Sequence, residues 1–211
     1  IDIVQPALVA VEIALANLWM SKGVFPDVVV GHSMGEVAAA YVAGNITLHE
    51  AAQIIIIRSR LMKQVSGKGE MGATDLTVEE ANELLKELEG KLAIAVMNST
   101  NSTVLSGDSE ALNAVFAVLE QQGRFNRKIK VDVASHSPQM DGIKDVLQKS
   151  LEHLRPKDAS VQFYSTVYNG FKNGQELDAA YWASNLRQPV QFGNAIHHLS
   201  EKHHVVYIEM S

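Results

Sequence analysis

The segment from Val28 to Tyr41 constrains the fold of this chain more than any other stretch. Three β-branched residues, Val28 to Val30, are typical of the end of a buried strand. Gly31-His32-Ser33-Met34-Gly35 then predicts a sharp turn, and Glu36 to Tyr41 predicts a helix. A G-x-S-x-G sequence between a strand and a helix is the nucleophile elbow of α/β-hydrolase folds. We therefore expect Ser33 to lie exposed at the tip of the turn as a nucleophile.

The two glycines of this elbow are expected to have a steric role. A side chain at Gly31 or Gly35 would collide with the facing strand or helix, so the turn can be tight only with glycine there. The helix that follows has free backbone N–H groups and the positive end of its dipole at its first turn. We expect these groups to lie where an oxyanion would form after attack by Ser33.

Composition narrows the class of protein. The chain has 211 residues, of which 46% are hydrophobic and 20% charged, as in a globular domain with a sizeable core. A net charge of -6 argues against a nucleic-acid or anionic-membrane surface, and apolar runs such as Ile54 to Ile57 are too short to span a bilayer. The absence of Cys excludes disulfides and thiolate metal sites. We expect a cytoplasmic location.

Strands and helices alternate in the two outer segments of the chain, 1–70 and 135–211. The pattern predicts strands over 27–30, 161–167 and 205–208, the last of them buried, with a turn at Tyr168-Asn169-Gly170. It predicts helices over 5–20, 36–44, 48–65, 139–154 and 190–200, and one that begins at Asp178. This order indicates an α/β-hydrolase-like core, a parallel sheet covered by helices on both faces. Because the sequence starts without Met and stops just after a strand, we expect a piece of a longer protein.

The middle of the chain, 71–134, has a different pattern. Strands are predicted over 71–76, 92–97, 103–105 and 128–133, and helices over 77–88 and 109–121. The order β-α-β-β-α-β is that of a ferredoxin-like unit. We therefore expect a small subdomain at 71–134, inserted into a large α/β subdomain made of 1–70 and 135–211.

A serine nucleophile needs a base, and the chain has eight histidines. His136 follows the predicted strand 128–133 and precedes Ser137-Pro138, so it falls at the carboxyl end of a strand, where α/β proteins build their sites. His203 and His204 precede the last predicted strand, the late position of the base in ordinary α/β-hydrolases. Both possibilities stay open on pattern alone. His32 adjoins Ser33, but neighbours in a tight turn point apart, which favours a packing role.

Arg58 interrupts an apolar run directly after Ile54 to Ile57. One interpretation is a solvated arginine near a helix end. The other is a guanidinium with a buried stem whose planar fork is offered to a carboxylate. The pattern does not choose between them.

Five motifs occur together in a recognisable order. They are Gln5-Pro6-Ala7-Leu8, Gly31-His32-Ser33-Met34-Gly35-Glu36, Arg58-Ser59-Arg60, Val133-Ala134-Ser135-His136 and Asn185-Leu186-Arg187-Gln188-Pro189-Val190. In order and rough spacing the chain resembles the acyltransferase domains of modular polyketide synthases. These are relatives of the malonyl-CoA:acyl-carrier-protein transacylases of fatty-acid synthesis. The resemblance covers essentially the whole chain.

The resemblance implies roles for the reacting residues. Ser33 would be the nucleophile and His136 its general base, with a backbone carbonyl from the Asn185 region orienting the imidazole in place of a triad acid. The Met34 N–H would be one oxyanion donor. The family's second oxyanion contact comes from a G-Q-G segment that precedes the Gln5 stretch and is not part of residues 1–211.

The resemblance also implies a substrate pocket. Arg58 would pair with the free carboxylate of a malonyl-type group, and Gln5 and His32 would line the acyl pocket. The family tends to have His-Ala-Phe-His for malonyl and Tyr-Ala-Ser-His for methylmalonyl. The small Ser135 favours methylmalonyl, whereas Val133 and Met34 match neither pattern.

The implied reaction carries an acyl group from coenzyme A, through acyl-serine, to the phosphopantetheine thiol of an acyl carrier protein, with no metal or other bound cofactor. Other domains of a polyketide synthase would be partners. A basic cluster of Arg124, Arg127, Lys128 and Lys130 either docks the acidic carrier protein or is a solvated strand edge. Two alternatives remain: a serine hydrolase with the same elbow, and a catalytically impaired carrier-binding domain.

Overall fold

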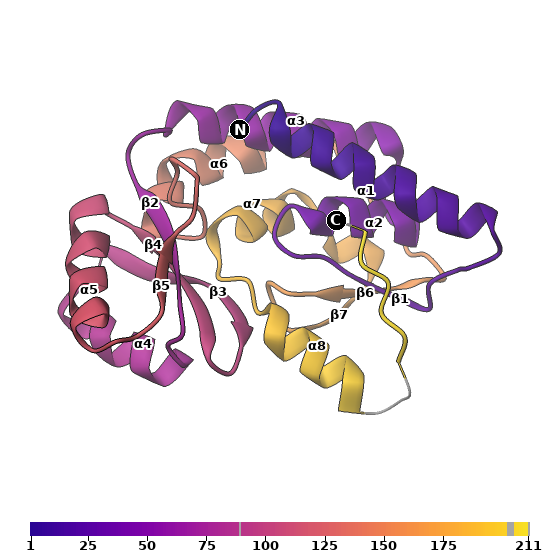
Figure 1. Ribbon diagram of the computed structural model, residues 1–211. Coiled ribbons are helices and arrows are strands. Elements are labelled where there is room, and N and C mark those ends of the chain that lie inside the picture. The colour runs from indigo at the N-terminus through magenta and orange to yellow at the C-terminus, as the bar shows by residue number, and fades with distance from the viewer. Residues whose placement is uncertain (89, 202–204, 211) are drawn as a thin grey trace.

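Two separate sheets organise the molecule (Figure 1). The computed structural model describes residues 1–88, 90–201 and 205–210. In the first sheet, β1 (Val28–Val30) pairs in parallel with β6 (Gln162–Ser165), and β7 (Gly170–Lys172) pairs with β6 in the antiparallel sense. The expected parallel sheet is thus a parallel pair with an antiparallel edge strand. The turn at 168–170 is present, but β7 is too short for its alternation to be read from the sequence.

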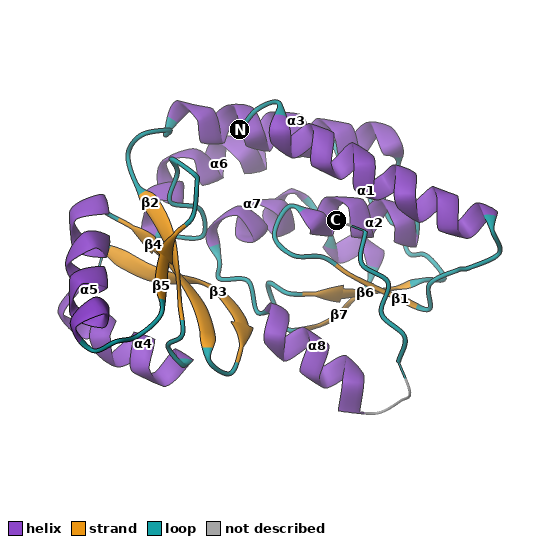
Figure 2. Ribbon diagram, viewed as in Figure 1, coloured by secondary structure: helices purple, strands orange, loops and turns teal. Residues whose placement is uncertain are grey.

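Helices cover both faces of this first sheet, as the alternating pattern predicted (Figure 2). Phe163 of β6 points toward α7, where its ring meets that of Tyr181, while the next residue, Tyr164, points the other way, to His198 of α8. Helices of this part are α1 (Val4–Ser21), α2 (Gly35–Ala43), α3 (Leu48–Gln64), α6 (Asp141–Ser150), α7 (Ala179–Arg187) and α8 (Phe192–Glu201). Short 3-10 turns lie at Pro138–Met140 and Gly174–Glu176.

The second sheet has four antiparallel strands in the order β3-β4-β2-β5. Their bounds are β2 (Glu70–Thr74), β3 (Leu92–Ser99), β4 (Ser102–Gly107) and β5 (Asn126–Lys128), with α4 (Val78–Leu85), a 3-10 turn (Lys86–Leu88) and α5 (Ser109–Gln121) between them. The helices pack on the sheet through a core that includes Leu105, Leu112 and Phe116. This confirms the ferredoxin-like arrangement, while the exact boundaries at 70 and 135 stay a prediction.

Two predicted strands differ from the structure. The strand expected over 128–133 is instead β5, which ends at Lys128. The Ile129 N–H still donates to the Met71 carbonyl of β2 at 2.9 Å, but the backbone then turns, with the Val131 N–H donating to the Ile129 carbonyl at 2.8 Å. The buried strand expected over 205–208 is wrong. These residues are 40–87% exposed and pair with no described strand, so their apolar character reflects no sheet.

The segment after α7 ties the two sheets together. Val190 forms a parallel bridge with Val96 of β3: its N–H donates to the Ala95 carbonyl at 2.8 Å, and its carbonyl accepts from Met97 N–H at 2.9 Å. The next residue, Gln191, donates its N–H to the carbonyl of Thr166, just after β6, at 2.9 Å. Val190 therefore bonds to the second sheet, and its neighbour Gln191 bonds to the residue that follows β6 of the first sheet.

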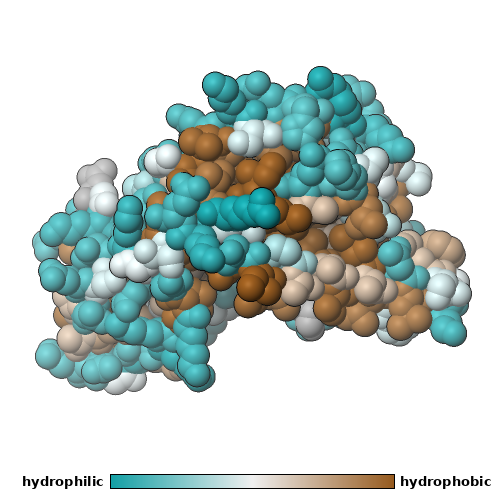
Figure 3. Space-filling model, turned by 90° about the horizontal axis from the view of Figure 1, so that it is seen from above, coloured by the Kyte–Doolittle hydropathy of each residue, from teal (hydrophilic) through white to brown (hydrophobic). Residues whose placement is uncertain are grey.

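α1 exposes an apolar face, which contributes to the brown area seen from above in Figure 3. Its members are Leu8, Val11, Leu15, Leu18 and Trp19, each 37–54% exposed, whereas Val9, Ile13 and Ala16 pack into the core. By length and composition α1 could cross a membrane, but a core helix of a soluble protein passes the same test.

Candidate active site

Ser33 lies at the predicted turn between β1 and α2, but it is partly buried rather than exposed. It has a left-handed backbone with φ of 54°, which costs a non-glycine residue about 1–2 kcal/mol. Gly31 makes the turn possible, because a Cβ there would lie 2.2 Å from the Glu36 backbone nitrogen. The predicted collision at Gly35 is wrong. A Cβ there would meet only the Glu12 carboxylate at 3.9 Å, since Gly35 already opens the helix.

Ser33 is hydrogen-bonded to His136. The distance from Oγ to Nε2 is 2.7 Å, and Nδ1 of the same ring lies 2.8 Å from the carbonyl oxygen of Gln188. A carbonyl can only accept, so Nδ1 carries the proton and Nε2 of the neutral ring is free to accept from the Ser33 hydroxyl. The orienting carbonyl belongs to the region predicted, three residues after Asn185.

Two flanking contacts hold the loop that carries His136. Its backbone N–H donates to the Leu186 carbonyl at 3.3 Å, and Ser106 of β4 donates its hydroxyl to the Ser135 carbonyl at 2.7 Å. The ring is 2% exposed, and its backbone, like that of Ser33, is left-handed, with φ of 59°. His203 and His204, the other histidines considered as bases, lie outside the described residues.

Arg58 reaches the same point from α3. Its Nη2 donates to Ser33 Oγ at 3.2 Å and its Nη1 to Gln5 Oε1 at 2.7 Å, so Gln5 of α1 holds one arm of the fork. The side chain is 1% exposed, its Nε has no partner, and no carboxylate of the described ranges pairs with it. The structure thus rejects the solvated helix-end interpretation.

The charge of Arg58 and the burial around it set the protonation of the site. Burial lowers the pKa of Arg58 to about 10, which leaves it a cation at neutral pH. Burial, and then the positive charge of Arg58, lower the pKa of His136 to about 3, opposed by the bond to Gln188. His136 is therefore a neutral imidazole, able to accept a proton from Ser33.

The remaining predicted site residues lie around this centre. His32 is exposed, with Nε2 3.2 Å from Asn98 Oδ1 and its ring 5.3 Å from that of Phe192. The Met34 N–H has no hydrogen-bond partner within the described ranges. Val133 and Ser135 are 1% and 8% exposed, and Val133 packs in the main hydrophobic core.

Comparison with known proteins identifies the family. The acyl transferase domain model matches residues 1–211. The chain belongs to the acyl transferase domain family. It is 44% identical over its whole length to Erythronolide synthase EryA2 of Saccharopolyspora erythraea, and 39% identical to Mycoketide-CoA synthase of Mycobacterium tuberculosis. It spans 6% and 5% of the lengths of these proteins.

Solved structures agree with this assignment. The acyltransferase domain from module 8 of the salinomycin polyketide synthase matches with a TM-score of 0.92 and 41% identity, over 94% of this chain and 47% of that one. The malonyl CoA-acyl carrier protein transacylase of Coxiella burnetii matches with a TM-score of 0.89 and 28% identity, over 95% of this chain and 66% of that one. The acyl transferase domain described here is thus about half the length of the first solved chain.

Sequence reasoning missed a carboxylate beside the elbow of this acyl transferase domain. Glu36 is 0% exposed and accepts hydrogen bonds from Thr166, Tyr181 and Asn185. Asn185 was expected to contribute through the backbone of its region, yet its side chain is in the site, because Nδ2 donates to the Ser33 carbonyl at 3.0 Å. The sequence held one signal: Glu36 directly precedes an apolar run, Val37 to Ala40, which the structure buries.

No group of three or more potential metal ligands occurs among His, Asp and Glu in 1–88, 90–201 and 205–210. The chemistry of the described site is that of a serine, an imidazole and a guanidinium.

The protonation of His136 is open to test by histidine NMR over a pH titration. Replacing Arg58 by Gln removes the positive charge that opposes the imidazolium, so protonation becomes easier and the pKa of His136 rises from about 3. It stays below the ordinary value because the ring is still buried. Arg60→Gln is the matched control, since Arg60 is exposed on the same helix. Equal shifts in both variants would contradict the electrostatic link between Arg58 and His136.

Proposed function

We propose that this acyl transferase domain moves a malonyl-type acyl group from coenzyme A to the phosphopantetheine thiol of an acyl carrier protein. One observation carries the proposal: a buried guanidinium that pairs with no carboxylate of the described residues lies 3.2 Å from the oxygen of a serine that is bonded to a neutral histidine. The serine–histidine pair supports acyl transfer, and the free cation supports an acyl group with a second carboxylate.

In the first half-reaction, His136 Nε2 takes the Ser33 proton while Oγ attacks the thioester carbonyl carbon. The Met34 N–H, free in the described structure, donates to the carbonyl oxygen as it becomes an oxyanion. The C–S bond then breaks, and the imidazolium gives its proton to the departing coenzyme A sulfur. The products are acyl-Ser33 and free coenzyme A.

In the second half-reaction, the phosphopantetheine thiol replaces coenzyme A. His136 takes the thiol proton, the sulfur attacks the acyl-serine ester, and the C–O bond breaks as the proton returns to Ser33 Oγ. The Gln188 carbonyl keeps the imidazole in the tautomer that both steps need. The enzyme is regenerated, so the kinetics are ping-pong.

Arg58 selects the acyl group. A carboxylate at its fork satisfies the free Nε and neutralises the buried charge, and Gln5 holds the guanidinium in place for it. His32 at the junction with Asn98 contributes to the wall of the site. The small Ser135, next to His136, favours methylmalonyl over malonyl by leaving space for a branch; Val133 is the other residue of this motif that we assign to the pocket.

The lengths of the relatives support the wider setting. The chain spans 6% of Erythronolide synthase EryA2, a much longer protein. We therefore propose other domains of a polyketide synthase as neighbours. We also propose a cytoplasmic location, and the net charge of -6 argues against a nucleic-acid or anionic-membrane partner.

Intact mass spectrometry tests the function directly. Incubation with a mixture of malonyl-CoA, methylmalonyl-CoA and acetyl-CoA is expected to add about 86 Da for malonyl or about 100 Da for methylmalonyl on Ser33. Ser33→Ala, which removes the nucleophile, forms no adduct. Added carrier protein then discharges the adduct onto its own thiol. Failure of the unaltered protein to form any adduct would contradict the proposal, and release of free acid with no transfer to carrier would indicate a hydrolase.

Selection by Arg58 is tested by competition between thioesters. Arg58→Ala removes the cation that pairs with the second carboxylate, so the preference for malonyl-type over acetyl thioesters, measured as the ratio of kcat/KM values, falls roughly a hundredfold or more. Arg60→Ala, two residues along α3, leaves the ratio in place. An unchanged ratio of kcat/KM values in Arg58→Ala would contradict the assignment of Arg58 to substrate selection.

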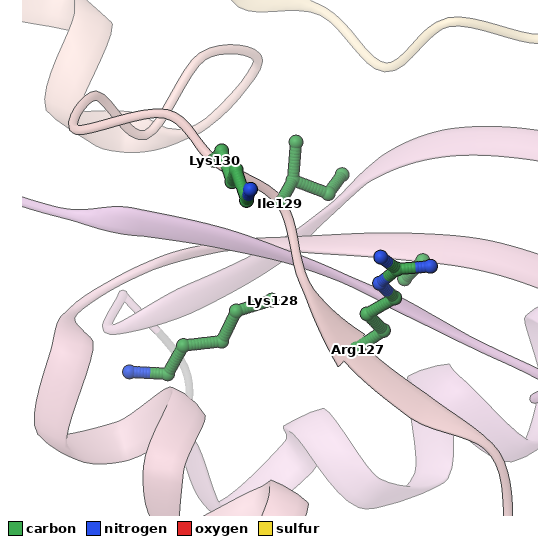
Figure 4. A pocket seen from close by; sticks show the side chains of 5 residues that line it. Arg127, Lys128, Ile129 and Lys130 are labelled. Atoms are coloured by element: carbon green, nitrogen blue, oxygen red, sulfur yellow. The ribbon is translucent and has the colours of Figure 1, made fainter.

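The four residues of the basic cluster expected to dock the carrier protein differ in their ion pairs. Arg124 pairs with Asp75 and Glu80, and Lys128 pairs with Glu70. Arg127 and Lys130 have no ion pair in the described part of the chain, and both line a shallow pocket at the open edge of β5 (Figure 4). Figure 4 shows Arg127 and Lys128 pointing to opposite sides of the strand. We propose that Arg127 and Lys130 are the carrier-facing charges.

Reversal of these two charges, Arg127→Glu with Lys130→Glu, is expected to raise the KM for carrier protein roughly 3–10-fold, because attraction to an acidic partner becomes repulsion. The acylation half-reaction, which involves no carrier, keeps its rate. Lys22→Glu with Lys149→Glu changes the net charge equally at two exposed positions, one just after the end of α1 and one on α6, and serves as control. An identical KM in both double variants would reject this docking surface.

A further inference from the structure

We propose that the Asn185 side chain, held by the buried carboxylate of Glu36, is a positioning residue that aims the Met34 N–H at the oxyanion. This inference rests on the proposed function, because an oxyanion forms only if Ser33 attacks an acyl group. The peptide group between Ser33 and Met34 is hydrogen-bonded at its carbonyl end and open at its N–H end in the described structure.

The carbonyl end of this peptide group has two donors. Asn185 Nδ2 donates to the Ser33 carbonyl oxygen at 3.0 Å, and the Glu36 backbone N–H donates to the same oxygen at 3.1 Å. The N–H end, on Met34, has no partner in the described structure. One end of the peptide is therefore fixed by two bonds while the other end is left open.

Because a peptide group is planar, fixing the Ser33 carbonyl also fixes the direction of the Met34 N–H. No cis peptide bond occurs in the described chain, so the Ser33 carbonyl and the Met34 N–H lie in one plane and point in opposite directions. Holding the oxygen holds the direction of the N–H. This matters because Ser33 has a left-handed backbone with φ of 54°, and a rotation of this peptide that relaxed the turn would swing the N–H away.

Asn185 is itself fixed in a single orientation. Its Nδ2 uses both protons, one on the Ser33 carbonyl and the other on Glu36 Oε2 at 2.8 Å. A flipped amide would place oxygen against two acceptors, so the two contacts define the amide orientation. Its Oδ1 is buried without a partner. The Asn185 amide thus leaves its acceptor unpaired in the core, while both of its donor protons are used at the elbow. We infer that the two donor contacts determine its orientation.

Glu36 is an equally fixed anchor. Its Oε1 accepts from the backbone N–H of Thr166 at 2.6 Å and from the hydroxyl of the same residue at 2.8 Å, and its Oε2 accepts from the Tyr181 hydroxyl at 2.7 Å. Tyr181 is in turn bonded to Ser165 at 2.8 Å. The carboxylate thus joins the end of β6, helix α7 and the elbow, and it supplies the acceptor that keeps Asn185 in place.

The experiment measures Ser33 acylation by rapid quench and intact mass in Asn185→Ala. Loss of an aligned oxyanion donor is expected to lower kcat for acylation roughly a hundredfold, with the KM of the extender thioester within about twofold of the original value. The preference for malonyl-type over acetyl thioesters and the acid limb of the pH profile stay unchanged, because Arg58 and His136 keep their contacts.

Asn45→Ala is the matched control. Asn45 is 2% exposed, donates Nδ2 to the Lys157 carbonyl at 3.0 Å and also has an unpartnered Oδ1, but it lies beyond the far end of α2 from Ser33. It should lose similar thermal stability and keep its kcat. Equal losses of kcat in the two variants would show a general structural effect and overturn the inference.

Glu36→Gln is a second variant that preserves the shape of the anchor. The Gln oxygen stays with the Thr166 N–H, so its amide faces the Asn185 amide, donor against donor, and kcat should fall in the same way. The double variant with Asn185→Ala should be no slower than Asn185→Ala alone, since Glu36 acts through Asn185. Additive losses would overturn this link.

The failures of the two proposals are distinguishable. If the unaltered protein forms no acyl adduct, the proposed function and this inference both fail. If it forms the adduct at full rate and Asn185→Ala matches it, only the positioning role is overturned.

Discussion

A positive charge buried without a counter-ion dominates this structure. Arg58 is 1% exposed, and its described partners are the neutral Gln5 and Ser33. An uncompensated buried cation is costly, and the core tolerates it because the fork is bonded by two neutral acceptors and because the neighbouring imidazole stays neutral. Burial of the unpaired Arg58 lowers the free energy of unfolding, and a bound anion would offset this cost by pairing with the guanidinium. In the proposed function, the residue whose burial costs stability is also the residue that selects the substrate.

A buried carboxyl group, that of Glu36, lies on the other side of Ser33. Glu36 is 0% exposed, and burial raises its pKa, while bonds from Tyr181, Thr166 and Asn185 favour its ionised form. Ser33 thus lies between the Arg58 guanidinium, which contacts its Oγ, and the Glu36 carboxyl group, which is linked to its backbone carbonyl through the Asn185 amide. Arg58 contacts the hydroxyl oxygen of Ser33, whereas Glu36, through Asn185, holds the backbone of the turn.

Much of this could be predicted from the sequence, since local pattern governs it. The elbow, the helices with Thr47 and Asp108 as caps and the ferredoxin-like order all follow from residues close in the chain. Resemblance to a family added Arg58 and His136 as partners of Ser33. What failed depends on distant contacts. Residues 205–208 pair with no described strand, and the backbone turns away from β2 just after Ile129. Glu36 lies in the first turn of α2, and its role depends on Thr166, Tyr181 and Asn185, which are far from it in the sequence.

The short link after α7 has a consequence for how the two halves of the molecule work together. Gln188 orients the imidazole, and Val190 and Gln191, just beyond it, bond to β3 of one sheet and to the end of β6 in the other. The loop of His136 is likewise bonded to β4 through Ser135. A tilt of one sheet against the other would be transmitted through these bonds to the ring. In the proposed reaction, the alignment of His136 with Ser33 therefore depends on how the two sheets are placed relative to one another.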